Sequence, residues 1–515
     1  MKMVKSLVLG SAAGLIAMSG AQAADLPVKA KAVEYVKVCS LYGAGFWYIP
    51  GTDTCIRIGG AVRIDTSFNA NTYDFPFWQG GASASKAFGK NWYGTRSRFN
   101  LTEDTRTATE YGVLRTYANV QMDWTGNGTS GIAGGTPVEV DYAFLQFAGF
   151  TIGKAVSEYD PQWALAKPTI TSGFFSGSND ATGINQLAYT ATFGNGVSGT
   201  ISVEDGQPYR TAGIVNTSVA FVAPWANPAT TLASGVYGVG NFTGNAVAGD
   251  HVPDVVGNLR LDQAWGSLHF AAAAHEVHAN YYGADSTTGH PDSTYGYAVT
   301  GAFELKNLPT GAGDSLKAEA GFAHGAAKYV FGGTIDTAGA GRFAAASGTQ
   351  GGTMAFGYVL DGVYSGTSAA NGTGIQLSNA WEVTAFYEHY WNPAWRTSVF
   401  GNYSQISYGS TGDAMLMANL TTVTTGTGHL AGAGGVGLAT GSMKFATAQV
   451  GTKTAWTPVK DLTISAEFLY TRMINNLNGT FVTTAGGVSG APAGTVYTLG
   501  SQNVYNGGVQ IIRSF

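Results

Sequence analysis

The sequence predicts an all-β fold, a 16-stranded antiparallel transmembrane β-barrel with short turns at one end and long loops at the other. Three observations lead to this prediction. Only 11% of the 515 residues are charged, whereas a soluble globular domain carries roughly 25%. Beyond the N-terminus, no apolar run is long enough to form a transmembrane helix. Apolar and polar residues instead alternate along many segments, which is the period of a β-strand.

The N-terminus predicts export from the cytoplasm. Two lysines precede a short apolar run, and a small-x-small cleavage site ends at Ala23. This order is typical of a secretory signal peptide rather than of a membrane anchor. We therefore expect residues 1–23 to be a signal peptide, residues 24–55 to form a separate N-terminal segment, and residues 56–515 to form the barrel.

The two cysteines of the chain, Cys39 and Cys55, both lie in this N-terminal segment. Export implies an oxidising compartment, which favours a disulfide that stabilises the segment by roughly 3 kcal/mol. A pair of buried free thiols is the alternative. The spacing is not C-x-x-C and no histidine lies nearby, so the pair does not predict a zinc site.

Alternation is clear in the first predicted strand, where the even positions from Ile56 to Phe68 are mostly apolar and the odd positions include arginine and aspartate. Along the rest of the chain, seven short turns alternate with eight long loops, which gives sixteen strands. The short turns are predicted at 110–112, 149, 194–196, 263–266, 306–314, 392–394 and 458–461. The long loops are predicted at 69–91, 126–138, 158–184, 205–253, 280–292, 327–375, 408–442 and 473–500.

This asymmetry of loop length favours a membrane barrel over a soluble sandwich, because bacterial barrels have short periplasmic turns and long extracellular loops. A bilayer cannot satisfy an open sheet edge, so the sheet must close. Four tryptophans flank predicted short turns, as expected for an interfacial aromatic girdle: Trp265, Trp391, Trp395 and Trp456. The alternative, that they pack the core of a soluble β-protein, does not explain the low charge.

The last predicted strand ends on Phe515, which shares a face with Val509 and Ile511. Outer-membrane barrels resemble this arrangement, in which a terminal aromatic residue is the signal read by the barrel-assembly machinery. Arg513 departs from the commonest pattern, which has an aromatic or apolar residue at that position.

If the apolar faces meet lipid, the opposite faces line an aqueous lumen. Five arginines of the first three strands then converge on one stretch of wall: Arg57, Arg63, Arg96, Arg98 and Arg115. Such a cluster can set a field across a narrow pore and bias ion passage. The alternative is that these arginines are solvated wall charges that are compensated locally.

The loop at 158–184 is the expected partner of these arginines. If it folds into the lumen, it narrows the pore and sets Glu158, Asp160 or Asp180 against the arginines. These residues and the five arginines form the predicted pore constriction.

No motif predicts an enzyme, a cofactor or a metal. The segment 149–154 has only part of the P-loop pattern and no helix pattern follows it. His275 and His278 are three residues apart on a predicted strand and therefore point to opposite faces, so we expect no metal site there. The net charge of −5 is thinly spread, which argues against a nucleic-acid partner.

Four stretches of the chain resemble alphaproteobacterial porins of the rhizobial and Brucella type. The resemblance is dense over about residues 24–205, and the stretches that carry it are VCSLYGAGFWYIPGTDTC from Val38, RTATEYGVLRTY from Arg106, AFLQFAGFT from Ala143 and YTATFGNGVS from Tyr189. It implies a homotrimer of sixteen-stranded barrels with an inward-folded third loop, set among the lipid and lipopolysaccharide of the bacterial outer membrane. It also implies passive diffusion of small hydrophilic solutes.

Two other functions remain open at this point. The same barrel could be a solute-specific channel, or an adhesin or receptor that works through its long loops. The loops at 205–253, 327–375 and 408–442 are long even for such porins. Neither the sign of any ion preference nor the faces that form a subunit interface follow from the periodicity.

Overall fold

The computed structural model describes twelve ranges of the chain: 37–69, 93–126, 138–170, 176–177, 182–206, 210–218, 246–332, 342–348, 350–421, 428–430, 440–483 and 492–515. The chain divides into two compact units, residues 1–57 and residues 58–515, which are described separately. The predicted signal peptide and Asp180 lie outside the described residues, as does most of the predicted loop at 69–91.

In the first unit, a disulfide joins Cys39 and Cys55, which confirms the disulfide over the alternative of free thiols. Both half-cystines are buried and pack against Phe46. A 3-10 helix and a short strand lie between the two cysteines, and the short strand pairs antiparallel with Cys55 and Ile56. These two elements are η1 (Ser40–Tyr42) and β1 (Trp47–Tyr48).

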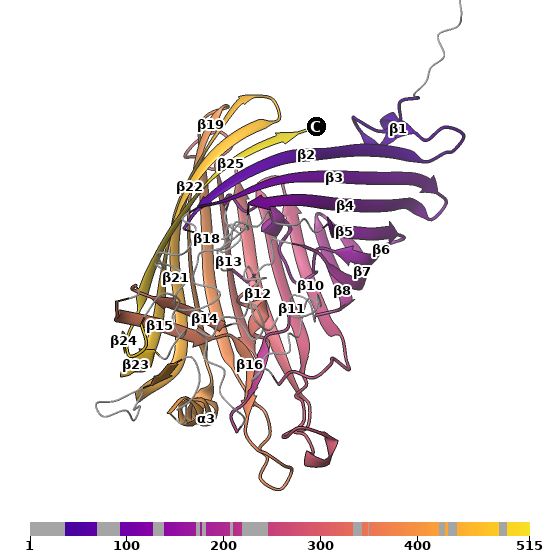
Figure 1. Cartoon of the computed structure of the whole chain (residues 1–515). Coiled ribbons are helices and arrows are strands. Elements are labelled where there is room, and N and C mark those ends of the chain that lie inside the picture. The colour runs from indigo at the N-terminus through magenta and orange to yellow at the C-terminus, as the bar shows by residue number, and fades with distance from the viewer. Residues whose placement is uncertain are drawn as a thin grey trace, which may run out of the picture. The chain divides into compact units, whose positions relative to one another are not determined.

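In the second unit, sixteen strands built from the described residues form a closed antiparallel barrel (Figure 1). Each strand pairs with its neighbour in chain order, and the last strand closes the sheet by pairing with the first. The predicted sixteen-stranded barrel is therefore confirmed. The strands are β2 (Cys55–Phe68), β3 (Tyr93–Thr109), β4 (Gly112–Gly126), β5 (Val138–Phe147), β6 (Phe150–Ala155), β7 (Ile184–Gly194), β8 (Val197–Glu204), β10 (Asp254–Gln263), β11 (Gly266–Val277), β12 (Thr294–Lys306), β13 (Ser315–His324), β18 (Asn379–Asn392), β19 (Trp395–Ser407), β21 (Thr440–Val459), β22 (Leu462–Asn478) and β25 (Gln502–Ser514).

All seven predicted short turns connect successive barrel strands at the predicted places. The turn between β7 and β8 illustrates why the residues at these positions form turns. Asn195 has φ of 50° and Gly196 has φ of 76°, a left-handed conformation that asparagine and glycine adopt at low cost. A Cβ at position 196 would also run into the carbonyl oxygen of Asp262 on the next strand. The turn therefore needs glycine both for its conformation and for the close approach of β10.

The outward and inward faces of the strands follow the predicted alternation. On β2, the side chains of Ile58, Val62 and Ile64 are about half exposed, whereas Asp65 is buried. At the short-turn end, the exposed rings of Trp395 and Trp456 stack with centroids 5.6 Å apart, consistent with the expected aromatic girdle. Among the residues described, no helix has the length and apolar character needed to cross a membrane.

The chain end takes part in barrel closure. The backbone N–H of Phe515 donates to the carbonyl of Gly60 at 3.0 Å, and the N–H of Gly60 donates back at 3.1 Å. The Phe515 ring is exposed and stacks on Phe99 at 6.3 Å. A Cβ at position 60 would collide with the carbonyl oxygen of Asn100 and lie 2.9 Å from the Phe515 ring. Glycine at position 60 therefore lets the terminal residue dock.

The long loops contain folded elements that sequence alternation does not reveal. A five-stranded sheet has the order β14-β15-β24-β23-β20, and a three-stranded sheet has the order β17-β16-β9. Figure 1 shows β14, β15, β16, β23, β24 and the helix α3 gathered at the end of the barrel where the long loops lie. The elements are β9 (Gly213–Asn216), β14 (Arg342–Ala346), β15 (Gly352–Tyr358), β16 (Leu360–Tyr364), β17 (Gln376–Leu377), β20 (Gly428–Leu430), β23 (Thr480–Thr483), β24 (Val496–Leu499), α3 (Gly409–Thr421), and the 3-10 helices η2 (Gln162–Ala166), η4 (Ser286–Thr288) and η5 (Ala327–Tyr329).

Candidate channel lumen

One side of the lumen carries an ion-paired arginine wall that begins on β2. The carboxylate of Asp65 accepts from the guanidinium of Arg63 at 2.8 Å and from that of Arg96 at 2.7 Å. Gln510 on β25 also donates to Asp65, at 2.9 Å. Asp65 and Arg96 are almost fully buried, so this pair is shielded from water. Three neighbouring strands are thereby linked by a single carboxylate.

The pairing continues on β3 and β4. Arg98 donates two parallel bonds to Asp123, at 2.6 and 2.7 Å, which is the strong bidentate geometry of arginine with a carboxylate. Asp104 accepts in the same way from Arg115, at 3.0 and 3.1 Å, and from Arg106. We call the following set the arginine ladder: Arg63, Arg96, Arg98, Arg106 and Arg115 with Asp65, Asp104 and Asp123.

Four of the five predicted arginines thus belong to one ladder, and the aspartates that hold them come from the same strands. The fifth, Arg57, belongs to the first unit, where its guanidinium lies 5.0 Å from the centre of the Phe46 ring. The ladder agrees with both interpretations of the sequence, the arginine cluster that sets a field and the wall charges that are compensated locally. The ladder arginines are compensated locally, and they are also fixed in position, as a stable field across a lumen requires.

The segment after β6 folds into the lumen, as expected for the third loop. Trp163 on η2 packs in a buried cluster with Phe386 and Phe400 of β18 and β19. Lys317 on β13 donates to the carbonyl of Ala166 at 2.9 Å, and Ser398 on β19 donates to that of Pro168 at 2.7 Å. The described part of this segment around η2 therefore lies against the inner surface of β13, β18 and β19.

The two described acidic residues of this segment have partners that the sequence did not suggest. The carboxylate of Glu158 accepts from Asn258 on β10 at 3.0 Å, and burial raises the pKa of this carboxyl although the Asn258 bond lowers it. Asp160 forms a buried ion pair with Arg210 from the long segment after β8. Asp160 is thus paired with an arginine outside the predicted set, because the segment after β8 also enters the barrel.

A second charged network lies where the long loops meet β10 and β11. His275 contacts Asp254 at 2.7 Å and Asp361 at 3.5 Å, and the Tyr329 hydroxyl donates to Asp254 at 2.6 Å. Asp361 also accepts from two backbone N–H groups, those of Ala212 at 2.8 Å and Ala327 at 2.6 Å. We call this set, completed by Asp160 and Arg210, the mouth network. It joins three separate loop segments to the barrel wall.

Arg210 is a fully buried member of the mouth network. Its guanidinium lies 5.5 Å from the ring of Tyr159 and 4.8 Å from that of Tyr329, and it donates to the carbonyl of Gly177 at 3.1 Å. One sequence signal could have pointed to it. Arg210 is the only lysine or arginine between Lys167 and Arg260, and a lone charge in a weakly charged loop becomes costly on burial unless it is paired.

The fold and the lumen together define a class of protein. A closed barrel with an apolar outer face, a charged inner face and aromatic residues near its short turns is an outer-membrane β-barrel. A family model described as the porin subfamily matches residues 25–507. The chain therefore belongs to this porin subfamily, whose members lie in the bacterial outer membrane.

Individual relatives agree with the family. The chain is 34% identical over 277 residues to porin Omp2b of Brucella suis biovar 1 (strain 1330) and 33% identical to porin Omp2b of Brucella melitensis biotype 1. These matches cover 52% of this chain and 64% of each relative, so they span just under two thirds of the relatives' length. Among solved structures, the outer membrane channel DcaP of Acinetobacter baumannii has the same fold, with a TM-score of 0.54, 14% identity, and coverage of 91% of this chain and 99% of that one.

Proposed function

We propose that this barrel is a water-filled channel, rather than an enzyme, and that it lets small hydrophilic solutes and ions diffuse passively across the outer membrane. The observation that carries the proposal is the arginine ladder, a set of paired charges on the inward faces of β2, β3 and β4. The side chains of Arg98 and Arg115 are 14% and 27% exposed on this inner face, and such partly exposed charges are stable when water fills the lumen beside them. Such transport needs no conformational cycle.

Selection among solutes is proposed to occur in two places. The first is the gap between the arginine ladder and the segment around η2, which sets the width of the lumen. The second is the mouth network, through which long-loop segments narrow the entrance. The mouth network also favours the second candidate, a channel that admits one class of solute, because a folded entrance can discriminate before the constriction does.

Single-channel recording in a planar bilayer tests the proposal. The purified, refolded protein should give large open steps, and closure in groups of three at high voltage would support a homotrimer. A folded barrel that gives no steps would contradict the channel. Liposome swelling with unrelated sugars and amino acids separates the two candidates, because a diffusion channel passes all of them at rates set by size.

Assembly is proposed to use the exposed end of the chain. The Phe515 ring is accessible while the backbone of this residue is bonded to Gly60, so the barrel-assembly machinery can read the ring. Phe515→Ala keeps those backbone bonds and should lower the amount of assembled barrel in the outer membrane. Wild-type amounts of heat-modifiable barrel for this variant would contradict the role of Phe515. Native electrophoresis of the same samples reports whether the assembled form, embedded in lipid and lipopolysaccharide, is a trimer.

A further inference from the structure

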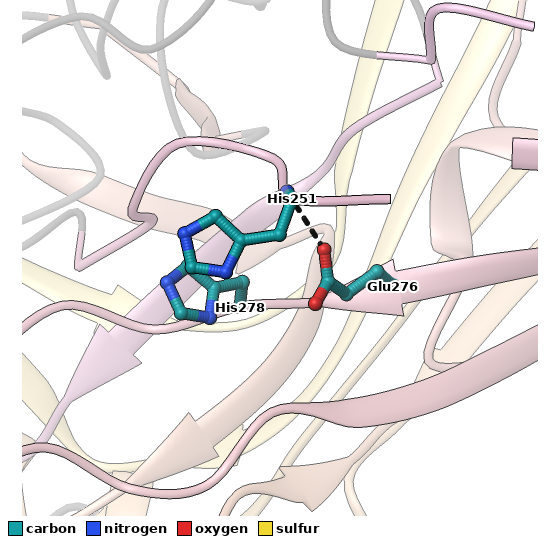
Figure 2. Close-up of side chains that lie close together, drawn as sticks. All are labelled: His251, Glu276 and His278. Carbon is teal, nitrogen blue, oxygen red and sulfur yellow. Dashed lines mark hydrogen bonds between the residues drawn. The ribbon is translucent and has the colours of Figure 1, made fainter. Parts of the chain in front are cut away.

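Two histidines and a glutamate meet at the long-loop end of β11. His251 comes from the segment that leads into β10, Glu276 is the penultimate residue of β11, and His278 follows the end of that strand. One ligand atom from each residue lies within 4.8 Å of the others. Figure 2 shows the two imidazole rings side by side, with the Glu276 carboxylate next to them. Their ring centroids are 4.0 Å apart.

The backbone around these residues is held firmly. One carboxylate oxygen of Glu276, Oε2, accepts from the backbone N–H groups of His251 and Val252, both at 2.9 Å. The same two segments are joined by a β-bridge between Val247 and Ala279. Because both hydrogen bonds reach Oε2, the other oxygen, Oε1, is the one that can take part in coordination.

The His278 ring also has an orienting partner. Its Nδ1 contacts the hydroxyl of Ser293 at 2.6 Å, which leaves Nε2 as the nitrogen for coordination. Metal-binding histidines characteristically use their second nitrogen in this way, and such partners fix the ring and raise affinity. His275 takes no part, since its ring contacts Asp254 and Asp361 in the mouth network. The sequence pattern of His275 and His278 alone predicted no metal site here, whereas in the structure His251 supplies a second imidazole beside His278.

We propose that His251, Glu276 and His278 form a binding site for a divalent transition-metal ion of the zinc class. Two imidazoles and one carboxylate are a common protein ligand set for zinc, with water completing a tetrahedron. Zinc–nitrogen bonds of about 2.0–2.1 Å place tetrahedral ligand atoms about 3.3 Å apart, so the side chains need only small rotations from their present positions. Magnesium and calcium prefer all-oxygen sites, which makes the two nitrogens selective against them.

A metal at this site would join two parts of the chain. His251 lies at the end of the long segment that follows β8, while Glu276 and His278 belong to β11 and its exit. The ion would therefore fix the return of this long segment onto the barrel rim. This role is separate from the lumen and does not depend on the proposed channel activity.

Zinc titration of the purified full chain, without a histidine tag, tests the site. After treatment with chelator, the protein is titrated with Zn²⁺ in the presence of a competing chromophoric chelator. We expect a single high-affinity ion per chain, unaffected by millimolar Mg²⁺ or Ca²⁺. His251→Ala and His278→Ala should each weaken zinc binding at least about tenfold. Removing only a residue that hydrogen-bonds a metal ligand already costs about 10- to 100-fold in affinity, and these variants remove a ligand itself.

His251→Ala is the sharpest variant because it removes the ring and keeps the backbone N–H that bonds Glu276. His324→Ala is the matched control, since His324 lies at the end of β13 and contacts Asn379 outside the cluster. Cobalt substitution gives a second readout, because intense visible bands report tetrahedral coordination. Absence of a high-affinity ion in the wild type, or wild-type affinity in both His251→Ala and His278→Ala, would overturn the proposal.

Discussion

The arginine ladder and the mouth network are both sets of paired charges inside one barrel, but they are assembled differently. The ladder joins residues of adjacent strands, such as Arg98 and Asp123, which face each other in the register of β3 and β4. The mouth network joins residues far apart in the chain, such as Asp160 and Arg210. The ladder is rooted in membrane-spanning strands, whereas the mouth network depends on loops that must stay folded. We therefore expect the ladder to keep its structure when one residue is substituted, and the loops of the mouth network to detach from the barrel wall.

The largest effect is expected from Arg210→Ala. This change leaves the buried carboxylate of Asp160 without its ion pair, and an uncompensated buried charge costs about 3–5 kcal/mol. The barrel strands should remain, while the mouth segments detach from the wall. Proteinase K should then cleave around residues 210–218 and 327–332 much faster than in the wild type, and single-channel conductance should rise.

Two companion variants make this result specific. Arg210→Lys keeps the charge and should be cleaved at a rate between those of the wild type and the alanine variant. Adding Asp160→Asn to Arg210→Ala removes the orphaned charge and should restore part of the protection. If Arg210→Ala is cleaved no faster than the wild type, the mouth network does not hold the loops.

The ladder could be predicted because it follows from strand period. Once β2, β3 and β4 are recognised as alternating strands, Arg63, Arg96, Arg98 and Arg115 must point inward, and the structure places them there. The same reasoning located the seven short turns, whose residues carry their own conformational signal. The alternation of apolar and polar residues is a local property, so the sequence of a single strand is enough to predict which of its side chains face inward.

The mouth network could not be predicted because no local pattern encodes it. Ala212 comes from the loop after β8, whereas Ala327 and Asp361 lie 34 residues apart in the loop after β13, and they meet only after the barrel has brought those segments together. Small and polar residues dominate these loops, which hides the short strands within them. Likewise, the spacing of His275 and His278 gives no sign of His251, which reaches His278 through the pairing of Val247 with Ala279.

A smaller effect is expected from replacing ladder arginines. Arg96→Ala with Arg98→Ala removes two inward positive charges and leaves Asp65 and Asp123 in the wall. The reversal potential in a KCl gradient should shift toward cation preference. We expect the permeability ratio to change about two- to fivefold, which corresponds to about 1 kcal/mol or less for a charge that acts through water.

Arg472→Ala is the matched control for this shift, because Arg472 is an exposed residue on the outward face of β22. It removes a positive charge from the same barrel but not from the lumen. If the reversal potential shifts equally in the control, or does not shift in the double variant, the ladder does not determine ion selectivity. Heat modifiability on electrophoresis should confirm that both variants are folded barrels.

The smallest effect is expected at the short-turn end, where Asp314 lies fully buried before β13. Burial alone would raise the pKa of this carboxyl, but hydrogen bonds from His389 at 2.8 Å, from Thr310 and from the backbone N–H of Tyr390 at 2.9 Å hold it well below its usual range. A carboxyl whose pKa is lower in the folded state than in the unfolded state stabilises the folded state. This stabilisation is fully present when the pH is above the unfolded pKa of about 3.9. That contribution is lost as the pH falls through the lower, folded pKa.

The thermal unfolding midpoint in detergent at pH 7 and pH 3 measures this contribution. The wild type should lose part of its stability between these pH values, while Asp314→Asn should start lower at pH 7 and decline less. Asp461→Asn is the control, because Asp461 lies in another short turn, is largely exposed and has φ of 63°, which asparagine also tolerates. Only the Asp314 variant should change the pH dependence, since the Asp314 carboxylate is buried and hydrogen-bonded, whereas that of Asp461 is exposed and forms a solvent-accessible ion pair with Arg513 at 3.6 Å. Proteolysis at the mouth should be unaffected, because the two ends of the barrel share none of these contacts.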